Sequence, residues 1–160
     1  MNVGWYESPC GRLRLTSDEE GLTSLLFEPE QEPIQAQEQD DEFITQTKQW
    51  LDDYFSGNNP DWIPALSLHG SDFQLSVWNH LLQIPYGTYT TYGTIAKMIA
   101  REKGIEKMSA QAVGGAVGRN PVCIIVPCHR VLGSDRSLTG YSGGIEPKMF
   151  LLDLEGIPYL

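Results

Sequence analysis

PVCIIVPCHRV, residues 121–131, runs from an apolar stretch straight into a proline, a cysteine, a histidine and an arginine. The apolar residues predict a buried, extended segment that ends at Pro127. Cys128 would then lie where the core gives way to a loop, with His129 and Arg130 making its surroundings polar and partly positive. Such surroundings favour the thiolate, the reactive form of cysteine. The stretch therefore predicts a core strand and, at its end, a candidate reactive thiol.

Two other interpretations of this thiol stay open on the residues alone. Free cysteine is among the most buried residue types, and both Cys10 and Cys123 fit a packing role. Cys123, Cys128 and His129 would supply three zinc ligands, but their spacing lacks the paired CxxC arrangement. Adjacent side chains of an extended segment also point apart. A packing or zinc-binding cysteine is thus the alternative to a nucleophile.

A cysteine nucleophile needs a proton acceptor and a group that orients the acceptor. His129 follows Cys128 directly, and a bridging water would join two neighbouring side chains that do not meet. A carboxylate should hold the far nitrogen of the imidazole. Glu146, Asp153 and Glu155 are all candidates for this carboxylate, and the residues alone do not choose among them.

Helices are expected on both sides of this stretch. Helical spacing of apolar residues, with Ser71 and Ser109 as caps, predicts four of them after residue 70: 72–84, 91–104, 110–120 and 146–155. The helix over 110–120 is rich in small residues and follows 91–104 after a short connection. This pair resembles a helix-turn-helix.

The first part of the chain has a different pattern. Alternating apolar and polar residues separated by turn-forming residues predict short strands over 3–8, 11–17 and 22–28. An acidic loop over 28–42 follows, and then a helix over 40–57 that ends at Gly57. Pattern and charge both change near residues 66–71, which predicts a domain boundary there.

The composition is that of an ordinary globular protein. A chain of 160 residues with 41% hydrophobic residues buries a core without metals or disulfides. Neither a signal peptide nor a run of about 18 apolar residues that would span a bilayer is found. Three cysteines at irregular spacing do not form a disulfide framework, so we expect a reducing, cytoplasmic location and no membrane association.

The charge is distributed unevenly. The formal net charge is −10, with −11 in residues 1–68 and +1 in residues 69–160. Usable positive charge therefore lies in the second part, although +1 is small for a surface that binds a polyanion. Charge alone does not decide whether nucleic acid is a partner.

Five stretches of the second part resemble, in order, the O6-alkylguanine-DNA alkyltransferases, also called methylated-DNA–protein-cysteine methyltransferases. They are IPYGTYTTYGTIA (84–96), AVGGAVGRNP (112–121), IIVPCHRV (124–131), GYSGG (140–144) and KMFLLDLEG (148–156). The resemblance implies a small α/β, RNase-H-like N-terminal domain over 1–68. A mainly α-helical C-terminal domain over 69–160 would carry the helix-turn-helix, the DNA-binding surface and the alkyltransferase site.

The resemblance also implies roles for single residues of the reaction centre. Cys128 would accept the alkyl group, His129 would take the thiol proton through a water, and Glu155 would orient His129. Asn120 would hold the turn between the recognition helix and the active-site strand. Tyr92 would crowd the target phosphate, help to rotate the nucleotide out and donate its hydroxyl group to the base.

The guanine pocket is implied in the same way. Tyr141 and Ser142 would line it, with the backbone N–H of Ser142 at the O6 position. The carbonyl groups of Cys128 and Val131 would accept hydrogen bonds from the exocyclic amine. DNA contacts would come from the recognition helix and its surroundings: Tyr92, Gln111, Ala112, Gly114, Gly115, Arg119 and Arg130, with Lys107 as a further candidate.

The small residues of this helix permit close approach to a groove but offer few groups that read base edges, so we expect binding largely independent of sequence. The same residues also suit close packing of two helices. One position departs from the family pattern, because Gln111 stands where an arginine fills the space left by the flipped base. Glutamine carries no charge and stacks less well, so weaker support of the flipped state is expected.

These residues predict a DNA repair protein. An alkyl group on O6 of guanine in double-stranded DNA would pass directly to Cys128 once the base is flipped, which takes a few kcal/mol. The thioether product has no easy leaving group, so each monomer would act once and need no cofactor or metal. The alternatives are a lesion-binding protein without efficient transfer, like the alkyltransferase-like proteins that lack the cysteine, and a cysteine hydrolase using Cys128 and His129.

Overall fold

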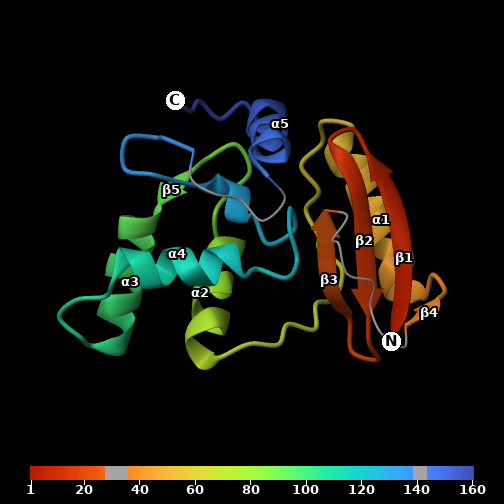
Figure 1. Ribbon diagram of the computed structural model, residues 1–160, viewed down its shortest axis with the longest axis horizontal. Helices are drawn as coiled ribbons and strands as arrows, with labels where there is room; N and C mark the ends of the chain where they lie inside the picture. Colours follow the sequence, from red (N-terminus) through yellow and green to blue (C-terminus); the bar gives the residue numbers. More distant parts are fainter. Residues whose placement is uncertain (28–35, 139–143) are drawn as a thin grey trace. The chain divides into compact units, whose positions relative to one another are not determined.

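The computed structural model describes residues 1–27, 36–138 and 144–160 (Figure 1). The chain divides into two compact units. The first contains residues 1–69 together with 121–123, and the second contains residues 70–120 and 124–160. The chain therefore enters the second unit, returns to the first for three residues, and enters the second again.

The first unit is a four-stranded sheet with one helix. Its elements are β1 (Asn2–Ser8), β2 (Gly11–Ser17), β3 (Leu22–Phe27), β4 (Gln37–Glu38) and α1 (Glu42–Phe55). The strand order is β3-β2-β1-β4, with antiparallel hairpins and β4 parallel to β1. α1 lies along one face of the sheet (Figure 1), and its buried residues are on the side that contacts β1, β2 and β3. The predicted strands and helix are found, but part of the expected acidic loop, residues 28–35, lies outside the described residues.

Glycine at one position of β1 lets α1 lie close to the sheet. A Cβ atom on Gly4 would stand 2.6 Å from Oδ1 of Asp40 and 2.8 Å from a side-chain carbon of Ile44. Real Cβ contacts are essentially never so short, so a larger residue here would force the side chains of Asp40 and Ile44 to move.

The second unit is mainly helical. Its elements are α2 (Asp72–Leu82), β5 (Thr90–Thr91), α3 (Tyr92–Lys103), α4 (Ala110–Gly118), the short 3-10 helix η1 (Cys128–Arg130), β6 (Val131–Leu132) and α5 (Ile145–Glu155). Ser71 and Ser109 cap α2 and α4 as predicted, while Gly104 and Gly156 end α3 and α5 in the left-handed conformation. None of the described helices has the length and apolar character needed to span a bilayer.

Trp78 ties α2 to α4 in the core of this unit. Its side chain is 2% exposed, and its indole Nε1 donates a hydrogen bond of 2.9 Å to the carbonyl oxygen of Ala116. The buried face of α4 consists of Val113, Ala116 and Val117. The opposite face of α4 therefore does not belong to the core of this unit.

The predicted strand over 121–127 is wrong, although residues 122–127 are buried. Val122 forms only an isolated bridge with Leu25 of β3, and residues 123–125 form turns. The amide of Leu25 donates to Pro121, and the amide of Cys123 donates to Leu25, each over 2.9 Å. Ile124 then turns the chain with a φ of 71°, which is unfavourable for a β-branched residue. The apolar pattern correctly indicated burial, but the chain must change units here and cannot stay extended.

Candidate active site

Cys128 begins η1, directly after Pro127, and its side chain is 3% exposed. The sequence predicted a thiol emerging into a loop, so this expectation of exposure is wrong for the described residues. The amide of Cys128 donates to Val126 over 2.7 Å, and its carbonyl accepts from the amide of Val131. The 3-10 turn thus replaces the corner expected between a strand and a loop. It places the sulfur among buried polar groups.

His129 and Glu155 form a buried pair beside this thiol. Nε2 of His129 lies 2.6 Å from Oε2 of Glu155, and both side chains have no exposed surface. Glu155 comes from the last turn of α5, so the structure chooses it over Asp153 and Glu146. Nδ1 of His129 is buried and finds no hydrogen-bond partner among the described residues. With Nε2 bound to a carboxylate, Nδ1 is the nitrogen left to take a proton.

Burial determines the protonation of this pair. It lowers the pKa of His129, and although Glu155 raises that pKa, the charges of Arg130 and Lys148 lower it further. Burial raises the pKa of Glu155, but hydrogen bonds and charge from His129 and Arg130 outweigh it and bring the pKa to about 2. The resting site therefore holds a neutral imidazole against an ionised carboxylate.

Arg130 lies elsewhere than the sequence suggested. We expected it at the DNA, but its side chain is buried and its guanidinium binds Glu155 through Nε at 2.7 Å and Nη2 at 3.1 Å. Nη1 donates to the carbonyl of Ile84 over 2.7 Å. The backbone N–H of Gly87 donates to Oε1 of Glu155 over 3.1 Å. Arg130 thus fastens the 84–87 turn and the active-site carboxylate to η1, and a DNA contact by this side chain is not supported.

Asn120 holds the turn that leads to Cys128. It is 2% exposed, and Nδ2 donates a hydrogen bond of 2.8 Å to the carbonyl of Val126. Its own amide donates to Val117 at the end of α4. The side chain therefore connects the end of α4 to the residue two positions before the thiol.

The small sheet of this unit places the start of α3 next to β6. β5 pairs with β6 in parallel, with Thr90 opposite Val131 and Thr91 opposite Leu132, and Tyr92 begins α3 directly after this pair. A Cβ atom on Gly114 would lie 3.7 Å from the Tyr92 ring. This is an ordinary van der Waals distance, so the Tyr92 ring lies next to α4 at Gly114 and leaves room for a methyl group there.

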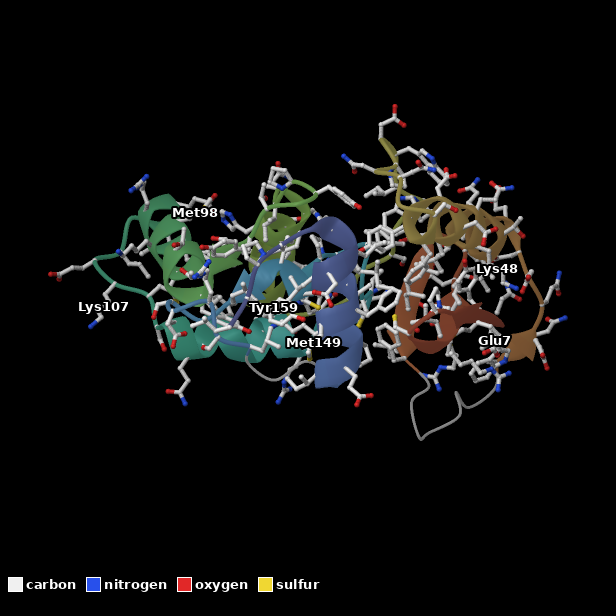
Figure 2. The ribbon with its side chains drawn as sticks, turned by 90° about the horizontal axis from the view of Figure 1, so that it is seen from above. Glu7, Lys48, Met98, Lys107, Met149 and Tyr159 are labelled. Atoms are coloured by element: carbon white, nitrogen blue, oxygen red, sulfur yellow. The ribbon has the colours of Figure 1, made fainter. Side chains whose placement is uncertain are left out.

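The exposed face of α4 carries most of the other predicted DNA contacts. Gln111, Ala112, Gly115 and Arg119 are all exposed on it, and a Cβ on Gly115 would meet nothing within 4 Å. Beside it, α3 and the connection over 104–109 line an open hollow with three cations and one acid: Lys97, Arg101, Lys107 and Glu106. Figure 2 shows Lys107 in this connection. Tyr141 and Ser142, predicted to line the guanine pocket, lie outside the described residues.

The sequence interpretation missed the place of Lys148. This residue is 1% exposed, and its Nζ donates a hydrogen bond of 3.0 Å to the carbonyl of Val131. The spacing of residues 148, 151, 152 and 155 is that of one helix face, and this spacing could have indicated that Lys148 is buried. In the structure these four residues form the buried face of α5. Among the described residues, no group of three or more His, Cys, Asp or Glu side chains is placed to hold a metal ion.

Two family models match this chain. A family model described as "6-O-methylguanine DNA methyltransferase, DNA binding domain" matches residues 72–157, and one described as "6-O-methylguanine DNA methyltransferase, ribonuclease-like domain" matches residues 1–62. This chain belongs to the 6-O-methylguanine DNA methyltransferase family. The resemblance seen in the five sequence stretches is thereby confirmed, as are a ribonuclease-like first part and a DNA-binding second part.

Relatives match this chain over nearly its full length. A methylated-DNA–protein-cysteine methyltransferase of Methanosarcina acetivorans is 44% identical over 98% of this chain and 99% of its own length. That of Haemophilus influenzae is 45% identical over 98% of this chain and 87% of its own. A crystal structure of Mycobacterium tuberculosis OGT in complex with DNA has a TM-score of 0.86 and 39% identity, covering 97% of this chain and 92% of that one.

Proposed function

We propose that this protein repairs DNA by moving an alkyl group directly from O6 of guanine to Cys128, as a methylated-DNA–protein-cysteine methyltransferase. The single observation that carries the proposal is the buried set of Cys128, His129 and Glu155 in a chain of this family. Cys128 is the acceptor, His129 takes its proton through a water, and Glu155 orients His129. Asn120 supports this set through the turn before Cys128.

The transfer is an in-line displacement. The electron pair on sulfur forms a bond to the alkyl carbon while the bond from that carbon to O6 breaks. Negative charge develops on the leaving guanine, where a positioned hydrogen-bond donor stabilises it. The hydroxyl group of Tyr92 and the backbone N–H of Ser142 are the donors we propose. The thioether that remains has no easy leaving group, so one molecule repairs one lesion without a cofactor.

The base is held by backbone groups as well as by Tyr92. In this proposal the exocyclic amine of guanine donates to the carbonyls of Cys128 and Val131. Within the protein, the carbonyl of Cys128 accepts from the amide of Val131, and the carbonyl of Val131 accepts from Lys148. Tyr141 and Ser142 complete the pocket in this proposal.

The partner is double-stranded DNA that carries O6-alkylguanine. In our proposal α3 and α4 act as a helix-turn-helix, and the exposed face of α4 enters the groove. Gln111 would fill the space left by the flipped base, while Arg119 and Lys107 contact phosphates. Residues 69–160 would contain the whole DNA-binding alkyltransferase domain. The protein would act as a monomer in the cytoplasm, where its free thiols stay reduced.

The alternative of lesion binding without transfer is not favoured. Cys128 is present together with the histidine and the carboxylate that a transferring thiol requires. Relatives 44% and 45% identical over 98% of the chain carry the name of the transferring enzyme. A turnover hydrolase using the same pair has no observation of its own in its favour.

Intact-mass measurement after incubation with a duplex containing O6-methylguanine tests the proposal. We expect the protein to become heavier by one methyl group, and peptide mapping should place that group on Cys128. Cys128→Ser should abolish transfer but keep binding to the lesion. Cys10→Ser is the matched control, because it also removes a thiol and should transfer normally. Transfer that persists in Cys128→Ser would refute the assignment.

A further inference from the structure

Lys148 is a buried cation that the proposed reaction does not yet use. Its side chain is 1% exposed on the inner face of α5, next in the chain to Met149, which is labelled in Figure 2. Its Nζ donates a hydrogen bond to the carbonyl of Val131. No carboxylate of the described residues lies within ion-pair distance of Nζ. A buried ammonium group without an anion is unfavourable by several kcal/mol.

The other charges around η1 are already paired. Arg130 and Glu155 neutralise each other through two hydrogen bonds, and His129 is held neutral by burial. The positive charge of Lys148 is therefore not balanced, and the buried site carries one positive charge in excess. A thiolate at Cys128 would bring the charge of the site to zero, whereas a neutral thiol would not.

We propose that Lys148 is the counter-ion of a Cys128 thiolate and also positions the Val131 carbonyl for the base. The inference rests on the proposed function, since it takes Cys128 as the nucleophile. Geometry supports both parts. Val131 accepts from Lys148 through its carbonyl and donates to the carbonyl of Cys128 through its amide, so one backbone unit joins the ammonium group to the residue that carries the sulfur. Burial lowers the pKa of Lys148, and a negative charge on Cys128 opposes that lowering.

The proton balance is simple. The S–H bond of Cys128 breaks, the electron pair stays on sulfur, and the proton passes through Nδ1 of His129 to solvent. His129 returns to its neutral form because burial opposes the imidazolium. Lys148 keeps the sulfur charged after the proton has left. During transfer the sulfur electron pair becomes the new carbon–sulfur bond.

Every titratable group facing the thiol bears on its pH dependence. His129 and Arg130 come from η1, Lys148 and Glu155 come from α5, and Tyr86 lies on the turn that Arg130 holds. Burial raises the pKa of Tyr86, and Glu155 raises it further, so this phenol stays neutral across the working range. Glu155 stays ionised. The remaining groups whose charge bears on the thiolate are Cys128 itself, His129 and Lys148.

Alkylation of Cys128 by iodoacetamide without DNA tests the inference. The rate at Cys128 is followed by peptide mapping from pH 5 to pH 10. Lys148→Gln keeps a hydrogen-bond donor for Val131 but removes the positive charge. The inflection in the plot of alkylation rate against pH should therefore move up by one pH unit or more, and the alkylation rate at low pH should fall about tenfold or more. Lys148→Arg should keep the wild-type inflection. Lys103→Gln, which removes an exposed lysine of α3, is the matched control and should change nothing.

An inflection that stays in place in folded Lys148→Gln overturns the proposal. A second measurement needs no variant: NMR titration of lysine side chains in the wild type before and after methyl iodide caps Cys128. Capping removes the thiolate, so Lys148 should titrate at lower pH, and an unchanged titration would also overturn the inference. If alkyl transfer from DNA is normal but the inflection does not move in Lys148→Gln, this inference alone is refuted. If the inflection moves but the protein transfers no alkyl group from DNA, only the proposed function is refuted.

Discussion

Glu155 receives hydrogen bonds from three directions, and this explains why a carboxylate is found in the core of the second unit. Arg130, His129 and the amide of Gly87 all bind it. A carboxylate held this way stabilises the fold only while it is ionised. The residue that we propose orients His129 is therefore also part of what holds α5, η1 and the 84–87 turn together.

We expect Glu155→Gln to lose about 3–5 kcal/mol of unfolding free energy at pH 7, because Arg130 stays buried without its charged partner. The pKa of Glu155 falls from its usual 4.5 to about 2 in the folded protein. Its contribution is therefore complete above about pH 4.5 and is lost as the pH falls through about 2. Urea unfolding at several pH values should show wild type and variant converging over that window.

The control for this prediction lies on the same helix. Glu146→Gln removes an exposed carboxylate in the first turn of α5 and should change the free energy by less than about 0.5 kcal/mol. Equal losses in the two variants, or a gap that does not narrow in acid, would contradict the role given to Glu155.

Among the helices, α4 presents an open face that its own stability does not need. Gly115 lies on this face, where a Cβ atom would meet nothing within 4 Å, and glycine in a helix interior is less favourable than alanine by about 1 kcal/mol. Glycine here weakens the helix without relieving any contact in the protein. The close approach of α4 to DNA that we propose would account for this glycine.

Two substitutions at Gly115 separate these effects. Both Gly115→Ala and Gly115→Leu should raise the melting temperature, because both favour the helix. Only the longer leucine side chain should stand between α4 and a groove, and we expect it to weaken duplex binding at least tenfold in a fluorescence anisotropy titration. Equal affinities of the two variants would mean that this face does not enter the groove.

The helices were predictable because their signals are local. Ser71, Ser109, Gly104 and Gly156 stand where caps are expected, and each caps or ends the helix predicted from it. The form of 121–127 was not predictable, since its turn at Ile124 depends on where the chain must go next. Pairing of Arg130 with Glu155 was likewise hidden, because 25 residues separate them and an arginine beside a thiol also suits a DNA contact.

Across the full chain, residues 121–123 belong to the first unit although both flanking segments belong to the second. Val122 is fully buried, and its neighbours pair with Leu25 of β3. The segment thus adds a short edge to the sheet of the first unit. Its packing contributes to the stability of that unit, even though the active site lies only five residues further along the chain.

We expect Val122→Ala to destabilise the protein by about 1–3 kcal/mol through the cavity it leaves. Hydrogen exchange of the full chain should show the loss chiefly in β1 to β3. Val77→Ala is the matched control, because Val77 is equally buried on α2, and its loss should appear in α2 to α4 instead. Identical hydrogen-exchange patterns for the two variants would show that residues 121–123 do not stabilise the first unit.

The bond from Trp78 to Ala116 gives the second unit an optical reporter. The chain has four tryptophans, and Trp78 is the one that lies in residues 70–120 or 124–160. Its indole is tied to the backbone of α4 and shielded from water. In a version of the chain that keeps only this tryptophan, the wavelength of the fluorescence emission would therefore report on α4 without an attached dye.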